Sequence, residues 1–238
     1  MRLGAPAFVF LVLAAPFSAI GVPLGDSEDL AGQEIVQKYL QASRTQQSVL
    51  RGGQMEVKMN AKLPRLDKQG VLLALRRISN FGKITYKALG FSGDNMIKNE
   101  VIARYLAIDA EGSDVAITPA NYKFKYKGQN SRDGRQVYLF QVTPRRKAVG
   151  LFRGELWLDA ATAMPVHQAG RFVKTPSVFL KKVEFAQDFE LQDGIAIPKH
   201  FQGTADMRLV GRAELSIDFS NFTRQLAADE EFANASNR

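Results

Sequence analysis

Residues 54–63, QMEVKMNAKL, alternate between apolar and polar side chains at all ten positions. This period of two is that of a β-strand with one face in a core and the other in water. The segments YKFKYK at 122–127 and AELSIDFS at 213–220 alternate in the same way. Because a half-buried strand of this kind is typical of antiparallel sheets, the pattern predicts a chain built mainly of antiparallel strands.

Further strands are expected between these three, because turn sequences such as RDG at 132–134 and QDG at 192–194 separate apolar runs. The additional strands are predicted at residues 70–79, 83–91, 135–143, 150–159, 165–174, 179–191 and 195–209. The predicted order is a helix, three strands, a second helix and about seven strands.

Two segments have helical spacing instead. The first spans residues 28–46, with Ser27 as its expected N-cap. The second spans residues 95–110 and carries one apolar stripe, formed by Ile97, Val101, Tyr105 and Ile108. Both helices are amphipathic, so each is expected to lay one face on the sheet.

A sheet of about ten strands tends to curl. Its concave face must then be filled by side chains, by a helix or by a ligand. We therefore predict a mainly β (α+β) fold, in which one large curved antiparallel sheet forms an incomplete barrel lidded by helices. The chain has no cysteine, so packing alone must hold this domain, expected over residues 22–226, with a flexible tail at 227–238.

The first residues have the parts of a secretory signal peptide. Arg2 precedes an apolar stretch at residues 5–20, and small residues follow. We expect a signal peptide over residues 1–21 and a periplasmic location in a bacterium with two membranes. A single membrane anchor is the alternative, although the stretch is shorter than the roughly 20 residues of a spanning helix.

No catalytic motif is recognisable in the sequence. GFSGD at 90–94 lacks the spacing of a nucleophile elbow. The two histidines, His167 and His200, are 33 positions apart and have no partner at metal-ligand spacing. The sequence therefore predicts no enzyme, no metal and no cofactor. Despite a net charge of +8, nucleic acid is not an expected partner of an exported protein.

One short motif carries a family resemblance. Residues 157–165 read W-L-D-A-A-T-A-M-P, in which the matching positions are Trp157, Asp159, Thr162, Met164 and Pro165. The motif resembles the W-x-D-x-x-T-G-L-P hairpin of periplasmic lipoprotein carriers and their relatives, the LolA, LolB and RseB proteins. Ala163 stands where that family often has glycine.

The resemblance implies an incomplete β-barrel lidded by helices, with an apolar cavity that takes acyl chains. In the carriers an arginine ties the barrel to the lid, and Arg51 is its candidate here by its position after the first helix. The apolar faces of three expected strands supply the predicted cavity lining, which is Met55, Val57, Met59, Phe152, Leu156, Leu158, Leu215, Ile217 and Phe219.

The predicted function is a non-enzymatic carrier or binder of lipids or lipoprotein acyl chains in outer-membrane trafficking. The alternative is a periplasmic sensor or protein-interaction module on the same fold. A membrane-protein donor or acceptor is a possible partner, and the oligomeric state stays open. The expected membrane or partner contacts are Arg145, Arg146, Lys147, Val178, Phe179, Leu180, Lys181 and Lys182. Solubility, edge protection and an ordinary core strand are the alternative explanations of these residues.

Overall fold

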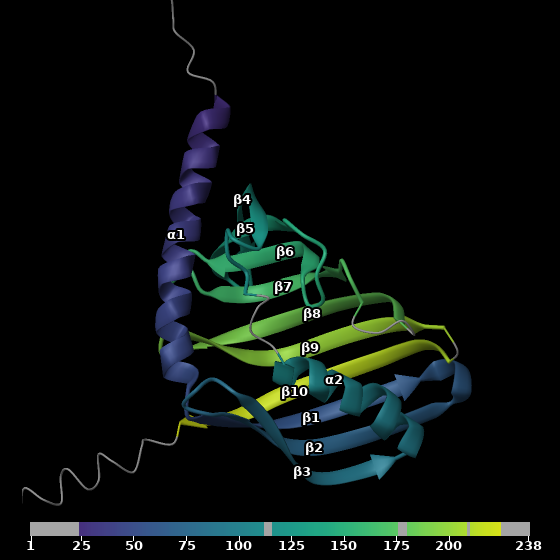
Figure 1. Cartoon of the computed structure of the whole chain (residues 1–238). Coiled ribbons are helices and arrows are strands. Elements are labelled where there is room, and N and C mark those ends of the chain that lie inside the picture. Colours follow the sequence, from purple (N-terminus) through teal and green to yellow (C-terminus); the bar gives the residue numbers. More distant parts are fainter. Residues whose placement is uncertain (1–23, 112–115, 176–179, 209, 225–238) are drawn as a thin grey trace, which may run out of the picture.

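The computed structural model describes residues 24–111, 116–175, 180–208 and 210–224 (Figure 1). The expected signal peptide, the expected tail at 227–238, and Val178 and Phe179 lie outside these residues. Ten strands form one sheet in the order β3-β2-β1-β10-β9-β8-β7-β6-β5-β4, and every neighbouring pair of strands is antiparallel. The predicted element order and fold class are confirmed.

The strands are β1 (Gly53–Leu63), β2 (Lys68–Ile78), β3 (Ile84–Gly93), β4 (Tyr122–Arg132), β5 (Arg135–Pro144), β6 (Phe152–Asp159), β7 (Pro165–Phe172), β8 (Leu180–Gln192), β9 (Ile195–Met207) and β10 (Gly211–Arg224). The helical elements are α1 (Leu24–Leu50), the 3-10 turn η1 (Pro64–Leu66), the π-helical segment η2 (Ile97–Ile102) and α2 (Ala103–Glu111). Together η2 and α2 form the second predicted helix.

The sheet is curved and open (Figure 1). Its terminal strands, β3 and β4, do not pair with each other among the described residues. Gly154 of β6 lies opposite Gly170 of β7. A Cβ atom on Gly154 would lie 1.9 Å from the carbonyl oxygen of Ala169, so these strands approach more closely than side chains would allow.

The helix α1 packs on one end of the sheet. Ile35, Val36 and Tyr39 are buried in a core cluster with residues of β4, β5 and β6. Near the end of α1, the amide of Gln46 donates to the carbonyl oxygen of Ala196 and accepts from its backbone N–H, both at 3.0 Å. These two bonds tie the helix to the start of β9.

The segment η2–α2 covers the other end of the sheet. Its buried Ile97 and Ile102 belong to a second core cluster, with residues of β1, β2 and β10. Asp94 caps this segment, because its Oδ1 accepts from the backbone N–H of Met96 at 2.7 Å. No helix among the described residues is long and apolar enough to span a membrane.

The middle of the sheet lies between these two clusters and is less well covered. In β1, every second residue is buried, as the sequence predicts. In β7 no residue is fully buried, and in β8 only Gln187 is. The two helices therefore leave the concave face incompletely filled over the central strands.

Candidate functional site: an apolar cavity under the lid

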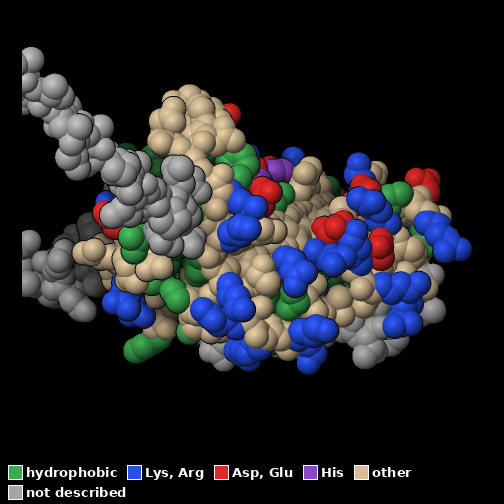
Figure 2. Space-filling view, turned by 90° about the horizontal axis from the view of Figure 1, so that it is seen from above, with side chains coloured by type: hydrophobic (Ala, Val, Ile, Leu, Met, Phe, Trp, Pro, Cys, Tyr) green, Lys and Arg blue, Asp and Glu red, His purple; other side chains and the backbone are tan. Residues whose placement is uncertain are grey.

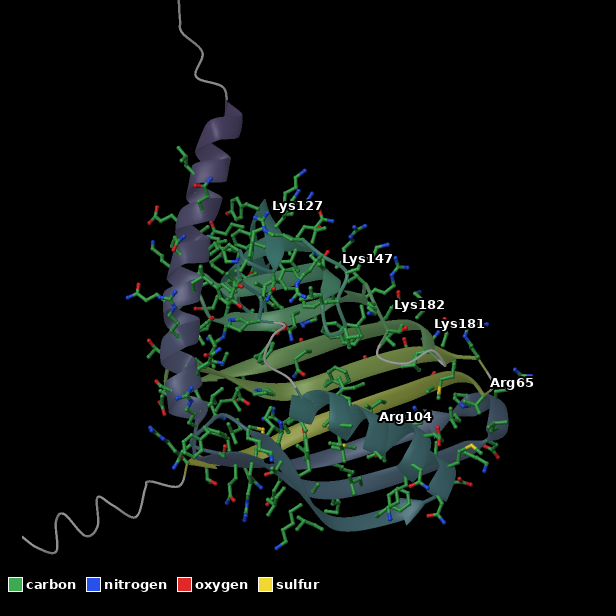
Figure 3. All side chains as sticks on the ribbon, viewed as in Figure 1. Arg65, Arg104, Lys127, Lys147, Lys181 and Lys182 are labelled. Atoms are coloured by element: carbon green, nitrogen blue, oxygen red, sulfur yellow. The ribbon has the colours of Figure 1, made fainter. Side chains whose placement is uncertain are left out.

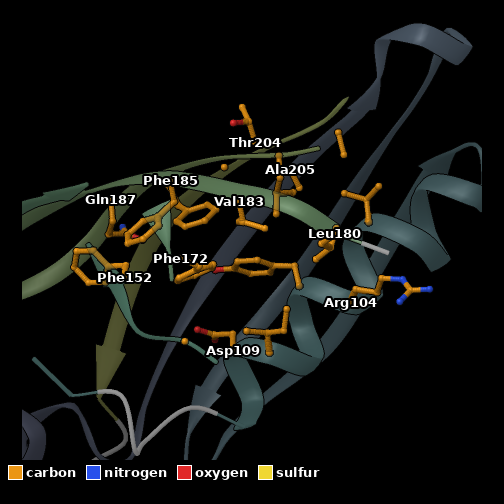
Figure 4. A pocket seen from close by; sticks show the side chains of 18 of the residues that line it. Arg104, Asp109, Phe152, Phe172, Leu180, Val183, Phe185, Gln187, Thr204 and Ala205 are labelled. Atoms are coloured by element: carbon orange, nitrogen blue, oxygen red, sulfur yellow. The ribbon is translucent and has the colours of Figure 1, made fainter. Parts of the chain in front are cut away.

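A cavity of about 440 Å³ lies between α2 and the concave face of strands β6 to β10 (Figure 4). Its walls are mostly apolar side chains from β3 and from β6 to β10. The strand residues on these walls include Phe152, Phe172, Leu180, Val183, Phe185, Phe201, Ala205, Met207, Ala213 and Leu215. The volume lies within the range of about 300–1,000 Å³ that is common for small-molecule sites.

A chain of aromatic rings runs along the cavity. The ring of Phe185 lies 4.9 Å from that of Phe152, 5.2 Å from that of Phe172 and 6.1 Å from that of Phe201. Tyr105 of α2 continues the chain, with its ring 5.3 Å from Phe201. Because these rings pack on one another, they form a stiff apolar wall.

The lid side of the cavity comes from the helical stripe that the sequence predicts. Val101, Tyr105 and Ile108 line the cavity, whereas Ile97 is fully buried in the adjoining core. The stripe therefore contributes both to the core and to the cavity.

Each charged side chain of the lining has an oppositely charged partner. Glu100 and Arg104 pair on the lid at 2.7 Å, and Glu214 lies 3.8 Å from Arg212. The fourth charged side chain, Asp109, pairs with a residue outside the lining. An unpaired charge would be costly beside an apolar ligand, so this pairing keeps the cavity suited to apolar groups.

Asp109 belongs to a network that joins the lid to the sheet. The Nε of Arg76, on β2, donates to Asp109 Oδ2 and to the Tyr86 hydroxyl, each at 3.1 Å. The Tyr86 hydroxyl donates to the same Asp109 oxygen at 2.6 Å. Burial lowers the pKa of Arg76, but Asp109 and Tyr86 outweigh burial, so its pKa lies above the ordinary value. Burial, with Asp109, raises the pKa of Tyr86. The guanidinium therefore stays charged and the phenol neutral.

The arginine that contacts the lid is not the one expected from the sequence. Arg51 is exposed in the turn after α1, and Arg76 makes the contact to the lid instead. The sequence held a signal for it, because Arg76 continues the period-two face of Leu72 and Ala74, both buried. A charged residue in phase with an apolar strand face indicates a buried polar contact.

The buried amide of the cavity is satisfied by the protein itself. Gln187 donates from Nε2 to the carbonyl oxygens of Asp188 and His200, both at 3.0 Å. Among the side chains described, no buried polar atom lacks a hydrogen-bond partner. The cavity wall therefore has no unsatisfied group that demands a polar ligand.

No protein-family model matches the sequence, and no curated protein matches it. Solved structures match it at low identity. A putative outer membrane lipoprotein-sorting protein domain from Vibrio parahaemolyticus is 12% identical, covering 87% of this chain and 98% of that one, with a TM-score of 0.45. A DUF1329 family protein from Desulfovibrio piger is 14% identical over 87% and 99% of the chains, also with a TM-score of 0.45. A LolA superfamily protein from Nitrosomonas europaea is 12% identical over 84% and 96%, with a TM-score of 0.39.

These likenesses concern the fold alone.

The hairpin predicted at residues 157–165 forms as expected. β6 ends at Asp159 and β7 begins at Pro165. Asp159 is buried, and its Oδ1 accepts from the backbone N–H of Ala161 and of Thr162 and from the Thr162 hydroxyl, at 3.1, 2.9 and 2.8 Å. Ala163 adopts a φ of 56°, the left-handed conformation that explains glycine at this position of the motif.

Of the nine predicted lining residues, the structure places Phe152 and Leu215 on the cavity wall. Leu156 and Leu158 are fully buried in the core beneath α1. The remaining five lie in or against the core cluster beneath η2–α2, and they are Met55, Val57, Met59, Ile217 and Phe219. The predicted inward faces of the strands are correct, but most of their residues pack against one another.

The predicted contact residues that the structure describes lie around one edge of the sheet. Leu180 lines the cavity, and Lys181 beside it is exposed. Lys182 pairs with Glu184 at 2.7 Å. The remaining described contacts, Arg145, Arg146 and Lys147, are exposed in the connection between β5 and β6.

The described residues contain no group of three or more potential metal ligands. His167 and His200 each form a pair with one aspartate, Asp188 at 2.6 Å and Asp218 at 2.7 Å. These pairs lie on neighbouring strands and account for both histidines without a ligand.

Proposed function

We propose that the cavity binds one long apolar chain, from a lipid or from the acyl group of a lipoprotein. On this proposal the protein is an exported, non-enzymatic carrier or binder in periplasmic lipid or lipoprotein trafficking. The observation that carries it is the cavity under α2, whose wall is apolar and whose charged groups are all paired.

The binding energy would come from burial of the chain. Each methylene removed from water contributes about 0.8 kcal/mol, so a chain of about ten carbons suffices for strong binding. The aromatic rings provide a wall along which a flexible chain can lie, and Met207 at the strand end can adapt to it.

A protein-interaction module is the rival function. It would leave the cavity without an apolar ligand and would use the outer surface of the fold. The two functions therefore differ in whether the protein carries an extractable lipid.

The test uses native mass spectrometry and solvent extraction of the protein purified from its own host, followed by titration with a fluorescent fatty acid. Ala205→Phe should fill the cavity and weaken uptake of the probe by about tenfold or more, because the new ring takes up the space of several methylenes. The control is Ala88→Phe, which adds the same ring at an exposed position of β3. A wild-type protein that neither carries lipid nor takes up the probe would favour the protein-interaction module.

A further inference from the structure

Every second connection between strands lies at the same end of the sheet. Because successive strands are antiparallel neighbours, their connections fall in turn at the two edges. The connections β1–β2, β5–β6, β7–β8 and β9–β10 lie at the same ends of the strands. We call this end of the sheet the basic edge. The connections β2–β3, β4–β5, β6–β7 and β8–β9 share the opposite edge.

The two edges differ in charge. The strand connections at the basic edge contain six basic residues, Arg65, Arg145, Arg146, Lys147, Lys174 and Arg208, against one acidic residue, Asp67. Those at the opposite edge contain one basic residue, Lys83, against two acidic residues, Asp133 and Asp193. Among the strand connections, the excess of positive charge therefore lies at one edge.

Basic side chains of this edge form an extended band. Figure 3 shows Lys147, Lys182, Lys181 and Arg65 along one side of the molecule, with Lys127 beyond them. Among the described residues, no ion pair is formed by Arg65, Lys147 or Lys181. In the space-filling view, Lys and Arg side chains are spread widely and Asp and Glu are sparser (Figure 2). Within the described part of the chain, Arg65, Lys147 and Lys181 therefore carry charges without an acidic partner, whereas Lys182 is paired with Glu184.

Exposed apolar side chains accompany the cations. Leu66 follows Arg65 in η1 and is 39% exposed, and Val149 follows Lys147 by two residues and is 40% exposed. Cations flanking exposed apolar residues suit the interface of a lipid bilayer, where headgroups and acyl chains meet.

The cavity reaches the same edge. Gly150 of the β5–β6 connection, Leu180 at the start of β8 and Met207 at the end of β9 all line it. Arg104 of the lid, labelled in Figure 4, also lines the cavity and keeps 41% of its side chain exposed. A chain leaving the cavity at this edge would emerge among the cations.

We infer that the basic edge docks on an anionic lipid bilayer, with the end of the cavity held against the headgroups. The part of this inference that concerns the cavity rests on the proposed function. Docking itself depends on the basic edge alone. A bilayer is favoured over an acidic protein because the cations are spread over separate connections, and a bilayer offers continuous negative charge.

The test is sedimentation of the purified protein with vesicles of phosphatidylcholine alone, or mixed in equal parts with phosphatidylglycerol. Wild-type protein should bind the mixed vesicles only, and less at high salt. The triple variant Arg65→Gln, Lys147→Gln, Lys181→Gln should bind them about tenfold or more weakly. The matched control, Arg51→Gln, Lys83→Gln, Arg135→Gln, removes the same charge from exposed positions near the opposite edge and should bind like wild type.

Equal losses in the two triple variants would overturn the inference, since net charge would then explain binding. Absence of wild-type binding to the mixed vesicles would also overturn it and would favour an acidic protein as the occupant. These results are distinct from those that would contradict the proposed function. The basic-edge variant should take up the fluorescent fatty acid normally without vesicles, whereas Ala205→Phe should lose the probe and still bind vesicles.

Discussion

Arg76 of β2 and Asp109 of α2 are joined at 3.1 Å across the junction between sheet and lid, and the Tyr86 hydroxyl donates to the same carboxylate oxygen. The guanidinium is almost fully buried, with 10% of the side chain exposed, and Asp109 keeps 26% exposed. A pair of this kind adds little stability over an apolar contact, but it is costly to break from one side. Because it joins the two elements directly, we expect it to hold the lid in place on the sheet.

We expect Arg76→Ala to destabilise the protein by about 2–3 kcal/mol, less than for a fully buried pair because Asp109 has some access to water. The measurement is urea unfolding followed by circular dichroism. Hydrogen exchange should show the largest loss of protection in α2. The control is Arg77→Ala at the next, exposed position, with an expected change below about 0.5 kcal/mol. Equal costs for the two variants would show that the network does not hold the lid.

The single tryptophan is less important to the core than the sequence suggests. If its ring were buried, Trp157→Ala should cost about 3 kcal/mol. The ring is instead half-buried, donates from Nε1 to Glu155 at 3.0 Å and lies 5.3 Å from the Arg132 guanidinium. We therefore expect a loss of about 1–2 kcal/mol for Trp157→Ala.

The comparison is Leu158→Ala at the adjacent position, whose side chain is fully buried. It should cost about 3 kcal/mol, because a cavity is left in the core. Both variants can be measured by urea unfolding. A larger loss at Trp157 than at Leu158 would contradict this assignment of the two faces of β6.

The strands could be predicted from the sequence because each alternates against a core. The residues Met55, Val57 and Met59 are in phase and are all buried, so period alone identifies their face. The helical stripe of η2–α2 is equally visible, because its spacing is local.

The cavity could not be predicted in the same way. Val183 and Phe185 of β8 line it, yet their spacing is that of Met55 and Val57, which pack in a core. What separates the two cases is where the helices lie across the sheet, and this depends on contacts such as that of Gln46 with Ala196, 150 positions apart. Period shows which face points inward and does not show what covers that face.

The lid should respond to acid through Asp94. Hydrogen bonds from Lys68, then from the Met96 backbone, hold the pKa of Asp94 below its ordinary value of 3.8. A carboxyl group with a lowered folded pKa contributes stability above its unfolded pKa and loses it as the pH falls through the folded pKa. The contribution should therefore be complete near neutral pH and be lost progressively as the pH falls below about 4.

The measurement is hydrogen exchange of η2 and α2 as a function of pH, corrected for the intrinsic exchange rate. Asp94→Asn keeps a cap acceptor but cannot ionise, so its protection of the segment should change less between neutral and acidic pH. The same pH dependence in both proteins would assign the effect to another group.

Because β6 and β7 approach closely, we expect a single methyl group added at Gly154 to destabilise the protein strongly. In Gly154→Ala, the new Cβ would lie 1.9 Å from the Ala169 oxygen and 2.6 Å from the Gly170 Cα. Both obstacles are backbone atoms, so no side-chain rotation relieves the clash and the strands must separate. We expect a loss of about 3 kcal/mol or more, at the upper end of overpacking effects.

Gly90→Ala of β3 is the matched control, because nothing lies within 4 Å of the position that its new methyl group would take, and its φ is not positive. It should change stability by less than about 0.5 kcal/mol. Since β6 and β7 carry Phe152 and Phe172 of the cavity wall, Gly154→Ala should also weaken uptake of the fluorescent fatty acid. If Gly154→Ala unfolds in urea like wild type, the two strands can separate to admit a methyl group at little cost.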